Sequence, residues 1–377
     1  MNSKKKILFC VFPIQFFLSH RLPLAQKARE EGYEIHLIST ASEGENIIQA
    51  EGFSFYPLVI SRSKANPLQE ISTIIQIYRI YKKIKPDIVH HVTIKPVLYG
   101  TLAARLAGVK AIVNAFSGLG HVFTAKSFKI SIIRLLVKMA YKLVLRHKNL
   151  VSIIQNQDDM EYLISKSIIQ NNQTVLIKGS GVDLNEFIPL PEPIGIPVIV
   201  LPARLLKDKG VIEFVEAAKI LQKLNIKIKM ILVGNIDLGN PSSITYEEID
   251  YWVKNKIISH WGFCSNMPET LAKANIVCLP SYREGMPKAL IEACASGRAI
   301  ITTDVPGCRE MIDIRNPNGI LVPPRDPKSL AKAIEDLVNN PRKRKEMAIN
   351  GRKMAEKEFS INLVVQKTMN IYRKLLD

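Results

Sequence analysis

Residues 276–295 read IVCLPSYREGMPKALIEACA and contain a strand, a loop and a helix in succession. The apolar run 276–280 has the length of a buried strand, and proline and glycine then interrupt the pattern. Pro287 suits the first position of a helix, and apolar residues recur at helical spacing over 287–296. A short strand that leads directly into a helix is the repeating unit of a parallel sheet covered by helices.

The same alternation extends along the chain in both directions. In the second half, strands are predicted at 197–202, 228–233, 258–262, 276–280, 299–302 and 320–322, and helices at 210–224, 266–273, 287–296, 306–312, 327–339, 341–357 and 361–376. In the first half, strands are predicted at 7–12, 34–39, 53–59, 87–92, 110–114 and 150–155, with helices including 21–32, 44–51, 68–84, 95–107 and 127–147. The predicted fold class is therefore α/β, with doubly wound sheets.

Two domains are expected, because 377 residues exceed what one hydrophobic core usually organises. Residues 189–197 contain four prolines in nine positions, which excludes a helix or a central strand there. The predicted domains are 1–188 and 196–358, and a final helix at 359–377 packs back toward the first domain. Two doubly wound domains that face each other leave a cleft at the carboxyl ends of both sheets, where ligands bind.

The N-terminus imitates a signal peptide, because three lysines precede the apolar run 7–18. The run is too short to span a bilayer, and no A-x-A-like cleavage site follows it. We therefore predict a buried first strand at 7–12. No other segment reaches 18 uncharged apolar residues, so we expect no membrane span.

The basic charge is concentrated in one part of the chain. The formal net charge is +18, and residues 60–148 contain 16 Lys/Arg against only Glu70 and Asp87. Such a field requires an anionic partner, for example nucleic acid, anionic lipid or a phosphorylated substrate. The five cysteines are scattered without a C-x-x-C pair, so neither a zinc site nor a disulfide framework is predicted.

Residues 202–210, PARLLKDKG, form a basic loop between a predicted strand and a helix that starts near Gly210. Arg204 and Lys209 then project from the carboxyl edge of the sheet. A helix N-terminus at this edge favours anions through its free N–H groups and its dipole. Arginine offers a planar fork to phosphate oxygens, and lysine offers a point charge. A solvated basic turn is the alternative.

A second motif contributes two carboxylates. Glu284 lies in the loop after strand 276–280, and Gly285 permits a tight backbone approach. Glu292 lies inside the following helix among apolar and small residues, where a carboxylate is costly unless it has a partner. The two carboxylates can each accept hydrogen bonds from vicinal hydroxyls. A pair of surface glutamates is the alternative.

Together these motifs resemble the retaining glycosyltransferases of family 4, which have the GT-B fold of two Rossmann-like domains. The matching motifs are R-x4-K-G at Arg204–Gly210, P-S-x-x-E-G-x-P at Pro280–Pro287, and E-x7-E from Glu284 to Glu292. The resemblance is strong over 195–357 and weaker over 1–190. It implies a hexosyltransferase without a cofactor, whose UDP-sugar is a substrate. No Asp-x-Asp metal motif is present, so fixed cations would stabilise the leaving diphosphate in place of a metal.

The resemblance also implies a role for individual residues. Arg204 and Lys209 bind the donor diphosphate, Glu284 contacts the transferred sugar, and Glu292 holds the ribose. The segment Gly262–Ser265 contacts the base. The implied donor-binding set is Arg204, Lys209, Gly234, Phe263, Glu284, Gly285, Met286, Pro287 and Glu292, and the implied catalytic set is Arg204, Lys209, Glu284 and His121.

One part of the sequence departs from the family pattern. Many members carry a histidine after the strand that corresponds to 110–114, but this chain has Ser117 near that place. The sequence here resembles the G-L-G variant of bacterial enzymes that extend undecaprenyl-diphosphate-linked sugars. The missing role falls either to His121 or to the backbone of Gly118–Gly120. Asn266 also stands where an aspartate is common.

Candidate acceptor-binding residues follow strands of the first domain, to which the resemblance assigns the acceptor. His20 follows the first strand, and the pair His90-His91 follows another strand, although a lone histidine is more often a structural residue. Lys95 and Arg62 are candidates to meet an acceptor phosphate. The acceptor-binding set is His20, Arg62, Lys95, Gly118 and Gly120.

The segment 126–148 is predicted as a basic amphipathic helix. Its basic stripe, with one residue every four, is Arg134, Lys138, Lys142 and Arg146, and apolar residues that fill the remainder include Leu135, Leu136, Met139, Leu143 and Val144. This profile is typical of a helix that lies in an anionic membrane surface. A domain helix with a solvated basic face is the alternative, but no acid occurs from 88 to 157, and solvated faces usually mix signs.

The resemblance thus implies transfer of a sugar from a UDP-sugar to a polyprenyl-diphosphate-linked saccharide in surface-glycan or glycoprotein-glycan assembly. The resemblance points to an N-acetylhexosamine such as GalNAc and to a peripheral position on the cytoplasmic face of the inner membrane. A nucleic-acid-binding protein is a competing hypothesis, but the basic segment has only Phe128 and Tyr141 as aromatic residues, so lipid fits better and no nucleic acid is expected. A UDP-sugar epimerase would need paired carboxylates in the first half, where acids are few.

Overall fold

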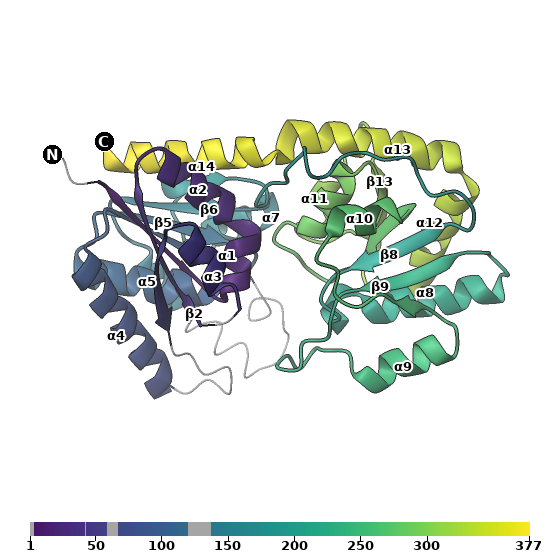
Figure 1. The fold of residues 1–377 in the computed structure, drawn as a ribbon, viewed down its shortest axis with the longest axis horizontal. Helices are drawn as coiled ribbons and strands as arrows, with labels where there is room; N and C mark the ends of the chain where they lie inside the picture. The colour runs from purple at the N-terminus through teal and green to yellow at the C-terminus, as the bar shows by residue number, and fades with distance from the viewer. Residues whose placement is uncertain (1–3, 42, 59–66, 120–136) are drawn as a thin grey trace. The chain divides into compact units, whose positions relative to one another are not determined.

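The computed structural model describes residues 4–41, 43–58, 67–119 and 137–377 (Figure 1). The chain separates into two compact units. Unit 1 comprises Met1–Ser180 and Asn362–Asp377, and unit 2 comprises Gly181–Ile361. Within the described ranges, no helix combines the length and the apolar composition that crossing a membrane requires.

The division between the units precedes the proline-rich segment 189–197, where composition had placed the boundary. Residues just after Ser180 already pack into unit 2. Val182 N donates a hydrogen bond to Phe359 O at 2.8 Å, and Ile361 N donates to Val182 O at 2.9 Å. These bonds tie the start of unit 2 to its last residues, so the proline-rich segment lies wholly within unit 2.

Unit 1 is built on a parallel sheet with strand order β3-β2-β1-β4-β5-β6-β7. Its strands are β1 (Lys6–Val11), β2 (Glu34–Thr40), β3 (Ser54–Leu58), β4 (Ile88–Val92), β5 (Ala111–Phe116), β6 (Leu150–Ile154) and β7 (Thr174–Leu176). The helices around it include α1 (Ile14–His20), α2 (Leu22–Glu30), α3 (Glu45–Ala50), α4 (Pro67–Ile84), α5 (Ile94–Ala107) and α7 (Gln157–Ser165). Residues 137–144 are also helical, within the predicted helix 127–147.

The first apolar run of the chain forms β1, an interior strand of this sheet. β1 pairs with β2 on one side and β4 on the other, and its residues from Ile7 to Val11 are fully buried. This confirms the predicted buried strand. The last helix, α14 (Ile361–Leu376), also belongs mainly to unit 1, where Asn149 Nδ2 donates to Leu375 O at 3.0 Å.

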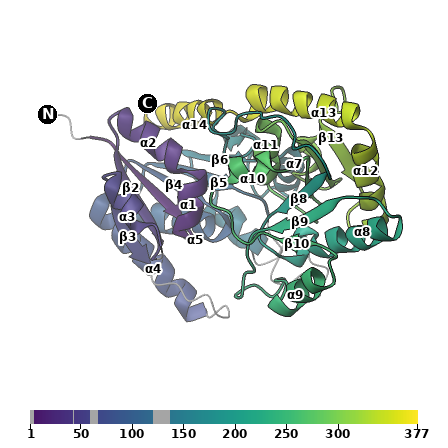
Figure 2. The same cartoon turned by 45° about the vertical axis from the view of Figure 1, so that its right-hand side comes forward.

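Unit 2 repeats the architecture with strand order β10-β9-β8-β11-β12-β13. Its strands are β8 (Val198–Pro202), β9 (Lys229–Val233), β10 (Ser259–His260), β11 (Ile276–Leu279), β12 (Ala299–Thr303) and β13 (Gly319–Val322). Its helices include α8 (Val211–Lys223), α9 (Tyr246–Lys254), α10 (Met267–Ala272), α11 (Lys288–Ala295), α12 (Pro327–Asn339) and α13 (Pro341–Met354) (Figure 2). All strand pairs within both sheets are parallel, which confirms the predicted α/β class.

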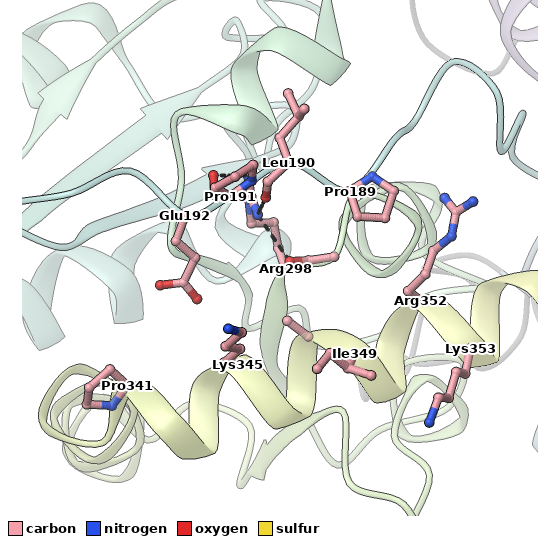
Figure 3. Close-up of a pocket in the computed structure, with 12 residues that line it drawn as sticks. Pro189, Leu190, Pro191, Glu192, Arg298, Pro341, Lys345, Ile349, Arg352 and Lys353 are labelled. Carbon is pink, nitrogen blue, oxygen red and sulfur yellow. Dashed lines mark hydrogen bonds between the residues drawn. The ribbon is translucent and has the colours of Figure 1, made fainter.

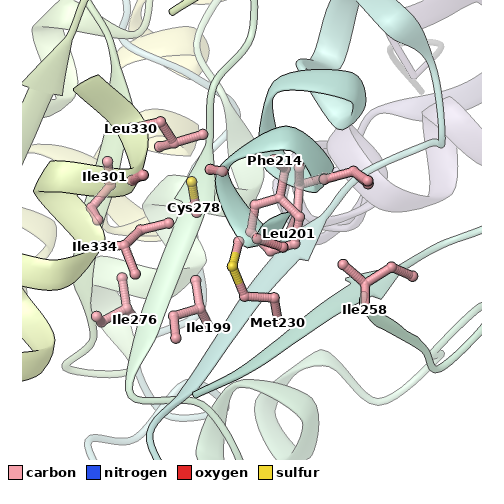
Figure 4. Packing of buried hydrophobic residues seen from close by; sticks show 14 of the residues in the cluster. Ile199, Leu201, Phe214, Met230, Ile258, Ile276, Cys278, Ile301, Leu330 and Ile334 are labelled. Carbon is pink, nitrogen blue, oxygen red and sulfur yellow. The ribbon is translucent and has the colours of Figure 1, made fainter. Parts of the chain in front are cut away.

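Both faces of the unit 2 sheet are buried. Ile199 and Leu201 of β8 lie on the face covered by α8 and α12, where Phe214 and Ile334 pack (Figure 4). Val200, between them, packs instead in the cluster that contains α11 residues. Strands buried on both faces require continuous apolar sequence rather than alternation. This explains why short apolar runs predicted these strands.

Several elements differ from the sequence prediction. Residues 306–312 form only a short 3-10 turn, Arg309–Met311, instead of a helix. The helix α9 was not predicted, although Tyr246, Ile249 and Trp252 recur at helical spacing along it and the last two are buried. Its start is nevertheless encoded, since Thr245 and Glu248 form a reciprocal capping box.

Candidate active site

The two motif loops of unit 2 emerge side by side at the carboxyl edge of the sheet, because β8 and β11 are paired neighbours. Tyr282 N donates to Asp208 O at 2.9 Å and joins the loops directly. Gly210 has φ 75°, and a Cβ there would lie 2.2 Å from Pro280 O. Only glycine fits this close approach without strain, so it sets the distance between the loops.

Lys209 and Glu284 form the centre of this site. Lys209 Nζ donates to Glu284 Oε1 at 2.5 Å, and Ser281 Oγ donates to the same oxygen at 2.7 Å. The two charged side chains are only 19% and 13% exposed. A partly buried ion pair that also receives a hydroxyl bond holds its groups in a defined geometry. The sequence motifs therefore meet in one cluster.

A third loop, which follows β12, also contacts Glu284 and fixes its position. Glu284 N donates to Pro306 O at 3.2 Å, and Thr303 Oγ1 donates to Ser281 O. Gly307 has φ 79°, and a Cβ there would lie 2.5 Å from both Glu284 O and Gly285 O. Loops from three consecutive strands of the sheet thus fix the position of the carboxylate.

Arg204 makes its side-chain contacts apart from this cluster. Its side chain is 63% exposed, and Nη1 donates to Asp237 Oδ2 at 2.9 Å. Gly234 has φ 136°, and a Cβ there would lie 2.0 Å from Ala203 O, so the loop after β9 packs directly against the residue before Arg204. The sequence did not indicate Asp237 as the partner of this arginine.

The segment predicted to contact the base lies beside the same edge. Gly234 N donates to Gly262 O at 2.7 Å, which joins the loops after β9 and β10. His260 Nε2 lies 2.8 Å from Gly234 O. Phe263 follows with an exposed side chain. Gly234 and Phe263 are therefore brought together by backbone hydrogen bonding.

Glu292 occupies the buried position that the sequence indicated. Its side chain is 8% exposed on α11, and Lys288 Nζ lies 3.1 Å from its Oε1. Burial raises the pKa of Glu292, and the Lys288 ammonium opposes that rise. Sequence reasoning required a partner for this carboxylate but missed Lys288, although the i,i+4 spacing is the signal for such a pair. Met286 is buried, and Pro287 caps the helix just before Lys288.

The candidate residues of unit 1 have their own partners. His20 ends α1, where its ring stacks on Phe16 with a centroid separation of 4.0 Å and its Nδ1 lies 2.6 Å from Ser19 Oγ. Lys95 Nζ pairs with Glu70 Oε1 at 2.7 Å. Gly118 has φ 107° and follows β5. Arg62, Gly120, His121 and Arg134 lie outside the described residues.

His90 and His91 are core residues of β4. His90 Nδ1 lies 2.5 Å from Tyr372 Oη, and His91 lies between Tyr81 Oη, 3.0 Å from Nε2, and Asn114 Oδ1, 2.7 Å from Nδ1. Burial lowers the pKa of His91 to about 4, and burial with the charges of Arg21 and His91 holds the pKa of His90 well below its usual range. Both histidines are therefore neutral near pH 7, and they serve packing.

Two protein-family models match the chain. Glycosyl transferase 4-like matches residues 6–155, and Glycosyl transferases group 1 matches residues 184–354, which include the three loops of unit 2. The chain thus carries the two domains of a glycosyltransferase, one that matches the 4-like model and one that matches the group 1 model. Within the described residues of this glycosyltransferase, no group of three or more His, Cys, Asp or Glu side chains is placed to hold a metal ion.

Named proteins resemble this glycosyltransferase over much of its length. The N,N'-diacetylbacillosaminyl-diphospho-undecaprenol alpha-1,3-N-acetylgalactosaminyltransferase of Campylobacter jejuni is 26% identical over 381 residues, with 96% of this chain and 98% of that protein covered. The UDP-Gal:alpha-D-GlcNAc-diphosphoundecaprenol alpha-1,3-galactosyltransferase of Escherichia coli is 28% identical over 253 residues, with 64% and 63% covered. A solved glycosyltransferase from Rickettsia africae has a TM-score of 0.80 at 21% identity, with 100% of this chain and 99% of that chain covered. The predicted GT-B fold is confirmed.

The glycosyltransferase also exposes part of its predicted membrane helix. In the described part, 137–144, Tyr141 and Val144 are buried, whereas Met139 and Leu143 are 59% and 70% exposed. Lys138 and Lys142 are partly exposed on the same segment, and Arg146 follows as an exposed residue. Val144 therefore belongs to the core of unit 1, and the remaining apolar and basic side chains are those that a membrane surface could contact.

Proposed function

We propose that this glycosyltransferase moves a sugar, with retention of configuration, from a UDP-sugar to a lipid-diphosphate-linked saccharide. The observation that carries the proposal is the cluster of Lys209, Glu284 and Ser281 at the edge of the unit 2 sheet. An ammonium and a carboxylate held together in a partly shielded site suit a ligand with a diphosphate next to a hydroxyl-bearing ring. A nucleotide-sugar has both groups.

Donor binding would exchange the partners of these residues. The diphosphate offers Lys209 more negative charge than one carboxylate does, so the ammonium turns toward it. Glu284 then accepts hydrogen bonds from hydroxyls of the transferred sugar. Arg204, which is exposed, adds a second cation, and Glu292 accepts bonds from the ribose hydroxyls. Each charge is held by the fold before the reaction begins, which is the condition for strong stabilisation of the leaving group.

The proposed chemical step is a displacement on one face of the sugar. The bond between the anomeric carbon and the phosphate oxygen breaks, while the acceptor oxygen bonds to that carbon on the same face. The acceptor proton passes to the departing phosphate oxygen. Lys209 and Arg204 stabilise the negative charge that develops on the diphosphate, so no side-chain nucleophile is needed.

The names of the relatives support the choice of substrates. The Campylobacter jejuni protein is named for transfer of N-acetylgalactosamine and for an undecaprenol-linked acceptor, and the Escherichia coli protein is named for UDP-Gal. We therefore propose an N-acetylhexosamine such as GalNAc as the sugar and a polyprenyl-diphosphate-linked saccharide as the acceptor. His20 and Lys95 are proposed to lie on the acceptor side, and the protein would work at the cytoplasmic face of the membrane.

A donor and acceptor screen tests this proposal. The purified protein is incubated with each of several UDP-sugars and a short-chain lipid-diphosphate-linked sugar, with and without EDTA, and the product mass is measured. We expect one preferred UDP-sugar, equal yield with EDTA, and an α-linkage in the product by NMR. Absence of product with every UDP-sugar, or a β-linked product, would overturn the proposal. An acceptor that lacks the diphosphate is the control for acceptor recognition.

The membrane contact is tested separately on unit 1. Replacing Lys138, Lys142 and Arg146 by glutamate is expected to release the protein from vesicles that contain phosphatidylglycerol, because each basic residue near such a surface contributes roughly 1 kcal/mol. Turnover of the short-chain acceptor is expected to stay unchanged. Unaltered vesicle binding would remove the proposed role of this helix and leave the transfer reaction untouched.

A further inference from the structure

Unit 2 contains a groove that lies between the proline-rich segment and α13. Its volume is about 630 Å³, and its walls include Pro189 and Pro191 on one side and Lys345, Ile349 and Lys353 on the other (Figure 3). None of the motif residues of the donor site lines it. The groove is therefore a separate feature of the same unit.

Two arginines, one buried and one partly exposed, hold the backbone on one side of the groove. Arg298 is 1% exposed, and its Nη1 donates to Leu190 O at 2.8 Å, beneath the proline-rich segment. Arg352 Nη1 donates to Phe187 O at 2.7 Å and to Ala295 O at 2.8 Å. The carbonyl of Leu190 in the proline-rich segment and that of Phe187 just before it thus have hydrogen-bond partners. The rings of Pro189 and Pro191 line the groove. Such a site is formed before any ligand arrives.

The charge around the groove has one sign. Glu192 is the only acid among the described residues that line it, and three hydrogen bonds of 2.7–3.1 Å from Arg344 to its carboxylate occupy that charge. Lys345 and Lys353 are exposed and make no hydrogen bond or ion pair with another described residue. The rim therefore presents two free cations to a ligand. An anionic group is the complement of such a rim.

Apolar side chains accompany these cations. Lys345, Ile349 and Lys353 are four residues apart on α13, so they form one stripe along the helix. Ile349 and Leu190, which line the groove, are 48% and 52% exposed. Soluble surfaces rarely gather large aliphatic side chains without a binding role. Aliphatic residues flanked by lysines form the pattern of a surface that lies against anionic lipid.

We propose that this groove binds an anionic phospholipid of the membrane, with one acyl chain against Pro189, Pro191 and Ile349 and the phosphate on Lys345 and Lys353. A nucleic acid fits less well, because no aromatic side chain lines the groove for base stacking. A second copy of the chain would bring a rim of the same positive charge, which opposes self-association through this face. The inference does not depend on the proposed transfer reaction, since lipid binding needs neither donor nor acceptor.

Vesicle binding of the full chain tests the charged half of the site. The variant Lys345→Gln/Lys353→Gln is compared with Lys223→Gln/Lys227→Gln, which removes the same charge from exposed lysines of unit 2 outside the groove. Vesicles contain phosphatidylglycerol and phosphatidylcholine. We expect the groove variant to bind about 30-fold more weakly, from roughly one factor of five per lysine, and the control to change less than about 3-fold. Equal loss in both variants would overturn the site, because the effect would then be net charge alone.

Chain insertion is tested with a soluble lipid. Dihexanoyl phosphatidylglycerol below its micelle concentration is titrated by calorimetry into wild type, Ile349→Ser and Leu190→Ser, with glycerol 3-phosphate as the headgroup alone. Binding of the lipid, much weaker binding of the headgroup and loss in Ile349→Ser support the proposal. Equal affinity for lipid and headgroup would reduce the groove to an anion site and overturn it. A concentration-dependent dimer that Ile349→Ser abolishes, seen by sedimentation, would also overturn it in favour of a second copy.

The two proposals remain distinguishable. The short-chain acceptor assay of the transfer reaction is repeated with Lys345→Gln/Lys353→Gln, and unchanged turnover is expected, since neither lysine belongs to the donor cluster. Loss of vesicle binding with normal turnover supports the groove. If the wild-type protein shows no transfer reaction, the proposed function fails, and the vesicle-binding comparison still supports or overturns the groove independently.

Discussion

The candidate residues of unit 2 and those of unit 1 occupy different positions relative to their strands. Glu284 lies in the loop that follows β11. It accepts a hydrogen bond from Lys209, which lies in the loop that follows β8. His90 and His91 instead lie within β4, where both side chains are buried in the core. In a parallel sheet covered by helices, ligands bind outside the carboxyl ends of the strands. A difference of a few residues therefore separates a candidate ligand group from a core residue.

The two regions also use their polar partners differently. The buried histidines take their hydrogen-bond partners from the core, including Tyr372, which is 282 positions away from His90 along the chain. Lys209 and Glu284 are satisfied by each other at a partly exposed position, so a ligand can replace either partner. Exchangeable partners are what a binding site needs, and permanent partners are what a core needs. The predictions below separate these two uses.

The largest expected effect comes from breaking the cluster of unit 2. Lys209→Ala and Glu284→Gln are each expected to lower kcat for sugar transfer by about 10³-fold, because each removes a preorganised group at the reacting centre. The double variant is expected to lose little more than either single one, since the two residues act together. Turnover with saturating donor is the measurement.

Lys207→Ala is the matched control, because Lys207 is an exposed lysine of the same turn. Its activity is expected to remain near that of wild type, and circular dichroism is expected to be the same for all variants. Near-normal turnover in Lys209→Ala or in Glu284→Gln would defeat the assignment of this cluster to catalysis.

The next effect is on stability and comes from the glycine that joins the motif loops. Gly210→Ala places a Cβ against Pro280 O at a left-handed φ of 75°, so we expect the free energy of unfolding of unit 2 to fall by about 3 kcal/mol. Urea unfolding followed by tryptophan fluorescence measures this, because both tryptophans of the sequence, Trp252 and Trp261, lie in unit 2.

Gly195→Ala is the control for strain without a clash. Gly195 has φ 105°, but no atom lies within 4 Å of a Cβ built there. We expect a loss of about 1 kcal/mol from the strained φ alone. Equal losses in the two variants would show that the approach of Gly210 to Pro280 carries no special constraint.

The sequence predicted the unit 2 site better than its surroundings, for physical reasons. Arg204, Lys209 and Glu284 are encoded by local patterns in which a strand, a turn and a helix start follow within a few residues. The partner of Arg204, Asp237, is 33 positions away in a loop whose path depends on packing, so no local pattern identified it. The contact of His90 with Tyr372 depends on where α14 packs, which the sequence of β4 does not contain.

The same reasoning applies to the fold. Apolar runs predicted the strands because both faces of each sheet are buried, and prolines and glycines marked where the runs end. The helix α1 was missed inside the apolar run 7–18, since hydrophobicity continues through Pro13 while the backbone changes from strand to helix. The helix α9 was missed although its apolar residues recur at helical spacing and a capping box marks its start.

A smaller effect is expected in unit 1 from its buried histidines. Burial lowers the pKa of His91 to about 4, against 6.5 for an exposed histidine. Between these values the unfolded chain binds a proton that the folded chain does not, so stability rises with pH and is lost as pH falls from 6.5 toward 4. At pH 5 the expected loss from His91 is about 2 kcal/mol, at 1.36 kcal/mol per pH unit. The lowered pKa of His90 acts in the same direction.

Hydrogen exchange of β4 and β11, corrected for intrinsic rates, compares the two units at pH 5 and pH 7. The protection of β4 is expected to fall at pH 5, while that of β11, which has no histidine, is expected to change less. The variant His91→Gln is expected to reduce the pH dependence of β4, whatever its effect on absolute stability. An equal loss in both strands would show that the histidines do not cause it.

The smallest effect is expected at the edge of the donor site, where Asp237 accepts a hydrogen bond from Arg204. If Arg204 binds the donor diphosphate, this carboxylate competes with the donor for the guanidinium. Exposed ion pairs contribute less than about 1 kcal/mol, so Asp237→Asn is expected to lower the donor KM by at most about 5-fold and to leave kcat unchanged. The effect is expected to shrink at high salt, which screens the competing charge.

A donor KM that rises instead would mean that Asp237 orients Arg204 for the donor rather than competing with it. Arg204→Ala, measured in parallel, is expected to raise the donor KM. In this background the further change Asp237→Asn is expected to leave the donor KM unchanged, because the guanidinium for which Asp237 and the donor compete has been removed.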